Sequence, residues 1–156
     1  MTLKVNSKKK LVSIITPAFN CAEFIEETIN SVLSQDYENI EYILVNDGST
    51  DNTYKILCKY QEYIKIINQE NEGQSSALNN GWELANGDYI GYLSADDVYE
   101  PNAISNLVEC LEKNPNSILS YGDWGLINSN SKQLRNIPGT DYNKFDLKNK
   151  LACVVG

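Results

Sequence analysis

The sequence contains no histidine among its 156 residues. This absence excludes Ser-His-Asp and Cys-His nucleophilic catalysis, and it also excludes zinc sites that depend on imidazole ligands. Any acid–base chemistry must therefore use carboxylate, tyrosine, lysine or cysteine side chains. The 4 cysteines lie far apart and form no CxxC pair. Their spacing favours reduced thiols in a cytoplasmic protein over a disulfide framework.

Long apolar runs and an excess of basic residues are also missing. No segment approaches the roughly 18–20 apolar residues of a membrane span, and the N-terminal MTLKVNSKKK lacks the apolar stretch of a signal peptide. The chain has 13 Lys and Arg against 21 Asp and Glu, and its formal net charge is -8. This balance disfavours nucleic acid as a partner. An anionic small ligand remains compatible with it where a metal ion reverses the local sign.

Hydrophobic patterning predicts an α/β fold in which strands and helices alternate along the chain. The pattern predicts a mostly parallel central sheet with helices on both faces. Helices are expected over 73–85 and 101–113, and two more are expected to start near Asn20, with Glu23 completing a capping box, and near Asp51, the latter running to about Tyr63. The strands are expected over 11–16, 40–46, 64–68, 89–94 and 118–121.

Polar segments follow four of the predicted strands. They read TPAFN over 16–20, NDGS over 46–49, NEGQ over 71–74 and SADD over 94–97. Ligands of open parallel sheets bind at the carboxyl ends of the strands, so we expect these segments to meet at one edge of the sheet. The sequence has no GxGxxG after its first strand and no GxxxxGK[ST], which disfavours a Rossmann dinucleotide site and a P-loop.

Three of these strand-end features have both a functional and a structural interpretation. Asp96 and Asp97 carry like charges that repel each other, and a hard cation such as Mg²⁺ or Mn²⁺ bound to both would remove that repulsion. The structural interpretation is that one of them caps the helix expected at Pro101. Asp47 either serves a ligand or belongs to an Asp-Gly turn. Phe19 is either a core residue or a surface on which an aromatic base stacks.

Several longer motifs occur together in a fixed order. They read VSIITPAFN, SVLSQ, YILVNDGSTDNT and NEGQSSALNNGWELANGDYIGYLSADD. Over roughly residues 11–101 this set resembles family 2 glycosyltransferases of the GT-A fold. The resemblance implies transfer of a sugar from a nucleotide diphosphate donor, a UDP-sugar, often with inversion. It also implies a saccharide or lipid-linked acceptor and a Mg²⁺ or Mn²⁺ cofactor.

The resemblance also assigns roles to individual residues. Asp47 would hydrogen-bond the base, and Gly73 would lie close to the nucleotide. Asp96 would lie near the ribose or the metal, and Asp97 would bind the metal that bridges the two phosphates. The nucleoside pocket would be lined by Pro17, Ala18 and Phe19.

The sequence departs from the family pattern at several places. Ser94 stands where some members have the first Asp of the metal motif, and Leu78 stands where many have Arg. The family's general base is expected beyond Gly156, because neither Asp123 nor Asp141 lies in a matching motif. The catalytic residue is therefore unassigned. The alternative is a non-catalytic nucleotide-sugar-binding module that lacks the base.

A third interpretation comes from NDGST, which faintly resembles aspartyl-phosphatase motifs. That class needs DxD on the first strand, where this sequence has Pro-Ala-Phe at 17–19. For the organisation of the chain we expect a flexible tail over 1–10, a nucleotide-sugar-binding core over 11–122 and the start of a truncated acceptor-side region over 123–156. The resemblance implies a location in the cytoplasm or at the inner face of the membrane. The apolar end LACVVG favours a homo-oligomer.

Overall fold

The computed structural model of the chain describes residues 9–138. The chain divides into two compact units, Met1–Pro101 and Asn102–Gly156, and each is described by itself. Asp141, the LACVVG end and the first eight residues of the expected tail lie outside the described residues. Within residues 9–138, no helix is long and apolar enough to cross a membrane. The three-part division at 10 and 122 stays a prediction.

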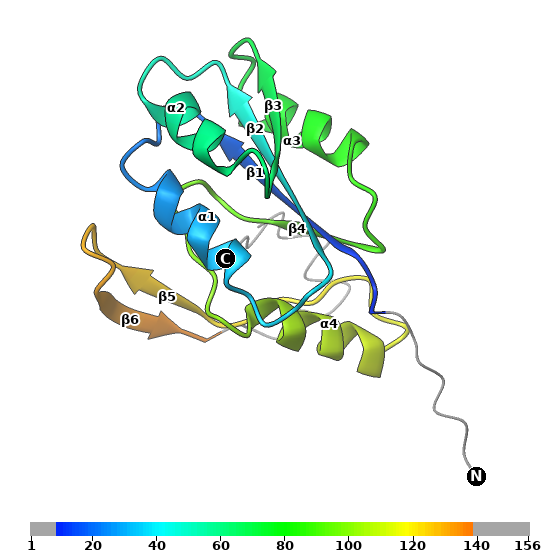
Figure 1. Cartoon of the computed structure of the whole chain (residues 1–156). Coiled ribbons are helices and arrows are strands. Elements are labelled where there is room, and N and C mark those ends of the chain that lie inside the picture. The colour runs from blue at the N-terminus through cyan, green and yellow to red at the C-terminus, as the bar shows by residue number, and fades with distance from the viewer. Residues whose placement is uncertain (1–8, 139–156) are drawn as a thin grey trace. The chain divides into compact units, whose positions relative to one another are not determined.

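The first unit is built on a sheet of four parallel strands in the order β3-β2-β1-β4 (Figure 1). All three pairings are parallel, as the alternating pattern predicts. β1 is central: it pairs with β2 on one side and with β4 on the other. The strands are β1 (Val12–Ala18), β2 (Ile40–Asp47), β3 (Lys65–Gln69) and β4 (Tyr89–Tyr92).

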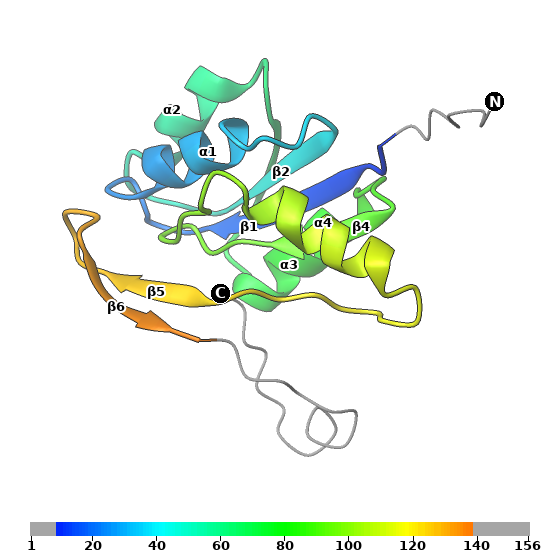
Figure 2. The ribbon, with the colours of Figure 1, turned by 90° about the horizontal axis from the view of Figure 1, so that it is seen from below.

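Helices cover both faces of this sheet. Figure 2 shows α1 (Ile25–Leu33) and α2 (Thr53–Leu57) on one face and α3 (Gln74–Glu83) on the other. The α3 face packs through a fully buried apolar cluster, because the β-branched residues of β1 and β2 alternate between the two faces. The cluster consists of Ile15, Ile43, Val45 and Ala77.

The first strand continues through Pro17, beyond the end predicted at Thr16. Proline has no N–H to donate, so it is tolerated only where no neighbour needs that donor. The carbonyl of Ile15 faces β4, where it accepts from the N–H of Leu93 at 3.1 Å. Pro17 faces the same side two residues on, where the pairing with β4 has already ended at Ile15. The missing N–H therefore costs no ladder hydrogen bond.

The predicted helix boundaries need correction. No capping box forms at Asn20 and Glu23, because α1 begins at Ile25 with Phe24 as its N-cap. The helix expected to reach Tyr63 ends at Leu57 and continues only as a short 3-10 turn, Cys58–Tyr60. The helix expected over 73–85 ends at Glu83. At Asn20 the side chain bonds to Thr50 and Asp51 instead of capping a helix.

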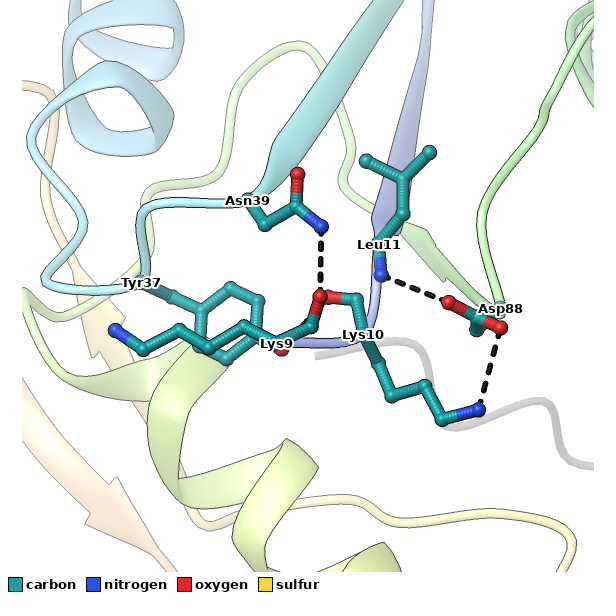
Figure 3. Close-up of polar contacts among 6 residues, drawn as sticks. All are labelled: Lys9, Lys10, Leu11, Tyr37, Asn39 and Asp88. Carbon is teal, nitrogen blue, oxygen red and sulfur yellow. Dashed lines mark hydrogen bonds and ion pairs between the residues drawn. The ribbon is translucent and has the colours of Figure 1, made fainter. Parts of the chain in front are cut away.

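The amino end of β1 is fixed by side chains from two other segments (Figure 3). Asp88 accepts a hydrogen bond from the N–H of Leu11 at 2.9 Å and pairs with Lys10. Tyr37 donates its hydroxyl hydrogen to the carbonyl of Lys10 at 2.7 Å. Lys9 lies over the ring of Tyr37, 5.5 Å from its centre. The last two residues of the expected tail are thus held against the first unit.

The second unit contains α4 (Ala103–Lys113) followed by an antiparallel hairpin of β5 (Trp124–Ile127) and β6 (Gln133–Ile137). The predicted strand over 118–121 is wrong: these residues form no strand. Ile118 is 98% exposed, so its high strand propensity is not supported by burial. The hairpin lies after residue 121, where the sequence predicts neither a strand nor a helix.

Candidate nucleotide-sugar site

A cavity of about 470 Å³ lies where the carboxyl ends of β1, β2 and β4 meet the start of α3. This is the edge of a parallel sheet at which ligands are expected to bind. Six residues singled out in the sequence come together in its lining: Pro17, Ala18, Phe19, Asp47, Gly73 and Asp96. Asp97 follows Asp96 directly but does not itself line the cavity.

The segment after β1 is fastened to the segment after β2 through Asn20. The backbone of Asn20 is in the left-handed region, with φ of 49°. Asn tolerates that region better than most residues. Its side-chain oxygen accepts hydrogen bonds from the N–H groups of Thr50 at 2.8 Å and Asp51 at 3.3 Å. Its own N–H donates to the hydroxyl of Ser49 at 3.1 Å. The sequence singled out Asn20 as a helix cap, and its actual role is to connect two loops of the cavity.

Phe19 precedes this connection and is 49% exposed. It is therefore not a core residue, and the structural interpretation of Phe19 is wrong. Because Asn20 holds the next peptide in place, the ring is presented at the cavity wall rather than left on a loose loop.

Asp47 holds the loop that leads into α3. One carboxylate oxygen accepts hydrogen bonds from the Gln69 side chain at 2.7 Å and the N–H of Glu72 at 2.9 Å. The other accepts from the N–H of Gly73 at 2.9 Å. Asp47 is 2% exposed, so its charge is balanced by these donors and by the positive end of the α3 dipole. The carboxylate thus has a structural role that the sequence did not predict, which is to hold the loop before α3, and it also lines the cavity.

Gly73 permits this contact through its backbone. Its φ is 89°, a region that residues with a Cβ rarely adopt. A Cβ added there would meet nothing within 4 Å, so the requirement is conformational rather than steric. The glycine thus directs the N–H groups at the start of α3 toward Asp47 and the cavity.

Asp96 and Asp97 lie beyond β4, and both are exposed. Partial removal of water from the Asp97 carboxyl and the adjacent charge of Asp96 both raise the pKa of Asp97, whereas a hydrogen bond with Ser94 lowers it. The N-cap of α4 is Asn102, so neither aspartate is the helix cap that the alternative interpretation required. Capping of α4 therefore does not explain why two like charges are adjacent here.

The donor set suits a hard divalent cation that keeps most of its own shell. Within residues 9–138 there is no group of three or more His, Cys, Asp or Glu side chains placed to hold a metal. Mg²⁺ and Mn²⁺ sites of phosphate-binding proteins need only one or two carboxylates, because water and phosphate oxygens supply the rest. Asp96 and Asp97 meet that requirement.

Comparison with known proteins decides the family. The family model described as glycosyl transferase family 2 matches residues 13–155. The chain belongs to glycosyltransferase family 2. Its α/β sheet has the GT-A fold, as the motifs predict.

Relatives of this chain occur in several bacteria. An uncharacterized glycosyltransferase of Rickettsia conorii is 43% identical over 136 residues, which are 85% of this chain and 22% of that protein. The uncharacterized glycosyltransferase EpsJ of Bacillus subtilis is 43% identical over 115 residues, which are 72% of this chain and 33% of that protein. The chain thus spans a third or less of the length of these two relatives.

Two solved structures share the fold and carry ligands. S. aureus TarS 1-349 in complex with UDP-GlcNAc superposes with a TM-score of 0.64 and 25% identity over 67% of this chain and 32% of that chain. The mannosyltransferase PcManGT of Pyrobaculum calidifontis, in complex with GDP-Man and Mn²⁺, gives a TM-score of 0.63 and 26% identity over 67% of this chain and 33% of that chain.

The structure locates Leu78 and Ser94, the two residues at which this chain departs from the family pattern. Leu78 packs against the buried cluster under α3 rather than reaching the cavity. Ser94 lines the cavity, and its hydroxyl lies 2.9 Å from that of Tyr92, which accepts a hydrogen bond from the Gln74 side chain at 2.6 Å. Tyr92, the last residue of β4, therefore links Ser94 to the start of α3. Gln74 lines the cavity as well, a position the sequence did not assign to binding.

Proposed function

We propose that this chain forms the donor-binding part of a glycosyltransferase that transfers a sugar from a UDP-sugar with the help of a divalent cation. The observation that carries the proposal is the single cavity at the carboxyl ends of β1, β2 and β4. Segments around residues 17–19, 47, 73 and 96 are far apart in the sequence, and all of them contribute to its lining. Such convergence is the structural requirement for a ligand that has a base at one end and phosphates at the other.

The nucleoside end is supported by Phe19 and Asp47. The exposed ring of Phe19 offers a face for stacking of a base. The Gly73-bound oxygen of Asp47 has one contact among those described, and a carboxylate oxygen has two lone pairs. It can therefore accept one further N–H, which uracil supplies from its ring. The complex of TarS with UDP-GlcNAc supports uracil, and the complex of PcManGT with GDP-Man makes guanine the base to test against it.

The diphosphate end is supported by Asp96 and Asp97, which would hold the cation. A bound Mg²⁺ or Mn²⁺ would offset the negative charge that develops on the leaving diphosphate. The backbone N–H groups at the start of α3 add a positive potential at the same cavity. The Mn²⁺ in the PcManGT complex supports a metal-assisted reaction for this chain too.

The test is a calorimetric titration of UDP into the protein with and without Mn²⁺. We expect Mn²⁺ to strengthen UDP binding, and we expect Asp97→Ala to remove that gain while leaving the fold intact. The matched control is Glu62→Ala, which removes an exposed carboxylate that does not line the cavity. GDP and CDP titrated in parallel test the base, and tighter binding of CDP than of UDP would contradict the role of Asp47. Absence of UDP binding in both conditions would refute the donor site.

A second candidate is the non-catalytic nucleotide-sugar-binding module. It is favoured by the cavity lining, whose carboxylates in the described part of the chain are Asp47, committed to α3, and Asp96, assigned to the cation. Neither is free to act as general base. Release of UDP from a panel of UDP-sugars separates the two candidates, because a binding module holds the donor without releasing UDP. The saccharide or lipid-linked acceptor, inversion, self-association and a cytoplasmic or inner-membrane location stay predictions.

A further inference from the structure

The SVLSQ motif lies at the end of α1, and the donor site described above does not use it. Three polar side chains, Thr28, Ser31 and Gln35, follow one another at intervals of three and four residues along α1 and the turn after it. This spacing puts them on one side of the helix. We call Thr28, Ser31 and Gln35 the α1 row.

The α1 row contacts the chain on both sides of the acidic pair. The hydroxyl of Thr28 donates to the carbonyl of Ala95 at 2.9 Å, immediately before Asp96. The hydroxyl oxygen of Ser31 accepts from the N–H of Tyr99 at 3.1 Å, two residues after Asp97.

The row continues at Gln35, whose amide donates to the carbonyl of Glu100 at 2.8 Å. One residue further on, the N–H of Asp36 donates to the carbonyl of Pro101 at 3.1 Å. Tyr99 is held a second time, because its hydroxyl donates to the carbonyl of Tyr92 at 2.9 Å. The segment that carries the two aspartates is therefore fixed at two points by α1, at two points by the turn after α1 and at one point by β4.

The contact of Thr28 differs from the usual behaviour of hydroxyl residues in helices, whereas Ser31 also donates to the carbonyl of Thr28 in its own helix at 2.8 Å. Such residues commonly donate to the carbonyl four residues earlier in their own helix. For Thr28 that carbonyl belongs to Phe24 and lies at 3.5 Å, whereas the carbonyl of Ala95 lies at 2.9 Å. Thr28 is fully buried, so the hydroxyl has no water as an alternative partner. A buried hydroxyl that donates to a loop carbonyl holds that loop in place, whereas valine, which has no donor, would leave the carbonyl without a partner.

We infer that the α1 row consists of positioning residues for cation and diphosphate binding by Asp96 and Asp97. This inference rests on the proposed donor site. Two adjacent carboxylates repel each other, so a loop left free would separate them when no cation is present. Groups that bind a metal must be held within about 0.5 Å of their bound positions to act together. Hydrogen bonds at Ala95 and Tyr99, directly before and shortly after the pair, supply that restraint.

The experiment uses two matched pairs of variants in the full chain. Thr28→Val keeps the shape of the side chain and removes the donor, whereas Thr28→Ser keeps the donor. Ser31→Ala removes the acceptor for Tyr99, whereas Ser34→Ala changes an exposed serine of the same segment whose hydroxyl contacts only the carbonyl of Ser31, at 3.4 Å. For each protein we would measure Mn²⁺ affinity in the presence of UDP by electron paramagnetic resonance, and UDP affinity without metal by calorimetry.

We expect Thr28→Val and Ser31→Ala to weaken Mn²⁺ binding about tenfold, as removal of partners that support metal ligands commonly does. Thr28→Ser and Ser34→Ala should bind Mn²⁺ like the wild type. UDP affinity without metal should be unchanged in all four, because the row does not contact the nucleoside end. A general loss of structure would lower both affinities together, so this difference separates positioning from folding. Amide exchange at Tyr99 should become faster in Ser31→Ala.

The outcomes distinguish this inference from the proposed function. Wild-type Mn²⁺ affinity in both Thr28→Val and Ser31→Ala, with binding lost in Asp97→Ala, would overturn the role of the row and leave the donor site standing. Failure of the wild type to bind Mn²⁺ and UDP would overturn the donor site, and the role of the row in ligand binding with it. If Thr28→Val does not fold, Ser31→Ala against Ser34→Ala decides the question alone.

Discussion

The carboxylate of Asp47 lies 2.9 Å from the backbone nitrogen of Gly73 and accepts its hydrogen. This contact joins the last residue of β2 to the residue before α3, across the wall of the cavity. One side chain therefore both lines the cavity and holds the two residues that precede α3.

Replacement of Asp47 by asparagine should lower both stability and nucleotide affinity. An amide offers one acceptor oxygen where the carboxylate offers two, so at least one N–H of Glu72 or Gly73 loses its acceptor in a half-buried hydrogen bond. The cost of such a group is about 1–3 kcal/mol in the free energy of unfolding. Urea denaturation measures the first effect and UDP calorimetry the second. Gln69→Ala is the graded control, because it leaves both backbone N–H groups paired with Asp47 and should cost less. Unchanged stability in Asp47→Asn would contradict this account.

Replacement of Asn20 separates a backbone effect from a side-chain effect. Asn20→Ala places a less tolerant residue in the left-handed region and also removes the acceptor for Thr50 and Asp51. The backbone part costs roughly 1 kcal/mol, and the lost hydrogen bonds add about 1 kcal/mol. Asn20→Gly loses the hydrogen bonds but adds no backbone cost in the folded state, because glycine tolerates the left-handed region. We therefore expect Asn20→Ala to be less stable than Asn20→Gly in thermal unfolding, and both to bind UDP more weakly because Phe19 is less firmly held. Equal stability of the two variants would show that the φ of Asn20 carries no cost.

Gly81 allows α3 to lie close against the sheet. A Cβ at this position would lie 2.6 Å from Cγ2 of Ile15 and 3.2 Å from Cγ2 of Val45, and both of these side chains are fully buried. Overpacking of this kind costs about 1–3 kcal/mol, which exceeds the roughly 1 kcal/mol that alanine gains over glycine in a helix. Gly81→Ala should therefore lower the free energy of unfolding measured in urea. The control is Asn79→Ala on the exposed side of the same helix, which should be neutral or slightly stabilising. Stabilisation by both changes would mean that the sheet yields to the added methyl group.

Glu41 should make the protein lose stability on acidification. Partial burial alone would raise the pKa of this carboxyl, but hydrogen bonds from Ser13 and Asn86 outweigh burial and lower the pKa below its ordinary value of 4.5. The folded state therefore favours the charged form. The resulting stabilisation is fully present above pH 4.5 and is lost as the pH falls through the lower folded pKa.

Unfolding of Glu41→Gln measured between pH 7 and pH 3 tests this expectation. The difference in stability between wild type and Glu41→Gln should be largest near neutral pH and should shrink below pH 4.5. Glu62→Gln, which changes the same charge at an exposed position, should show no such convergence. A constant difference across the whole range would exclude Glu41 as the source of the acid sensitivity.

The architecture of the first unit could be predicted from the sequence because its strands are unusually explicit. β1 and β2 are β-branched runs buried on both faces, and such runs are typical of central parallel strands. The same logic put the polar residues after each strand at one edge, and six of them do line one cavity. The prediction needed only the order of elements and the rule for parallel sheets.

The contacts that hold the site could not be predicted in the same way. Asn20 has the residue type of a helix cap, but its side-chain partners lie about thirty residues away in sequence. Asp51 does accept from the N–H of Thr53 at the start of α2, as predicted, but it also accepts from the N–H of Ala22, about thirty residues away. Nothing local distinguishes a cap from such a connection between loops. The row on α1 was equally hidden, because Thr28 and Ser31 fit an ordinary polar helix face until the position of Ala95 is known. The hairpin of β5 and β6 was missed because its strands are only 4 and 5 residues long and lie among polar residues, and most of its apolar side chains are exposed.

Because β1 lies between β2 and β4, the loops that line the cavity come from two opposite sides of this strand. Loops on the β2 side would face the nucleoside, and the loop after β4 would face the cation and the phosphates. A change of base preference would then require substitutions on one side only, and the metal chemistry on the other side would be left intact. If the proposed function holds, this architecture would separate the recognition of a donor from its activation, and a lineage that carries it would acquire a new nucleotide without rebuilding the loop of Asp96 and Asp97.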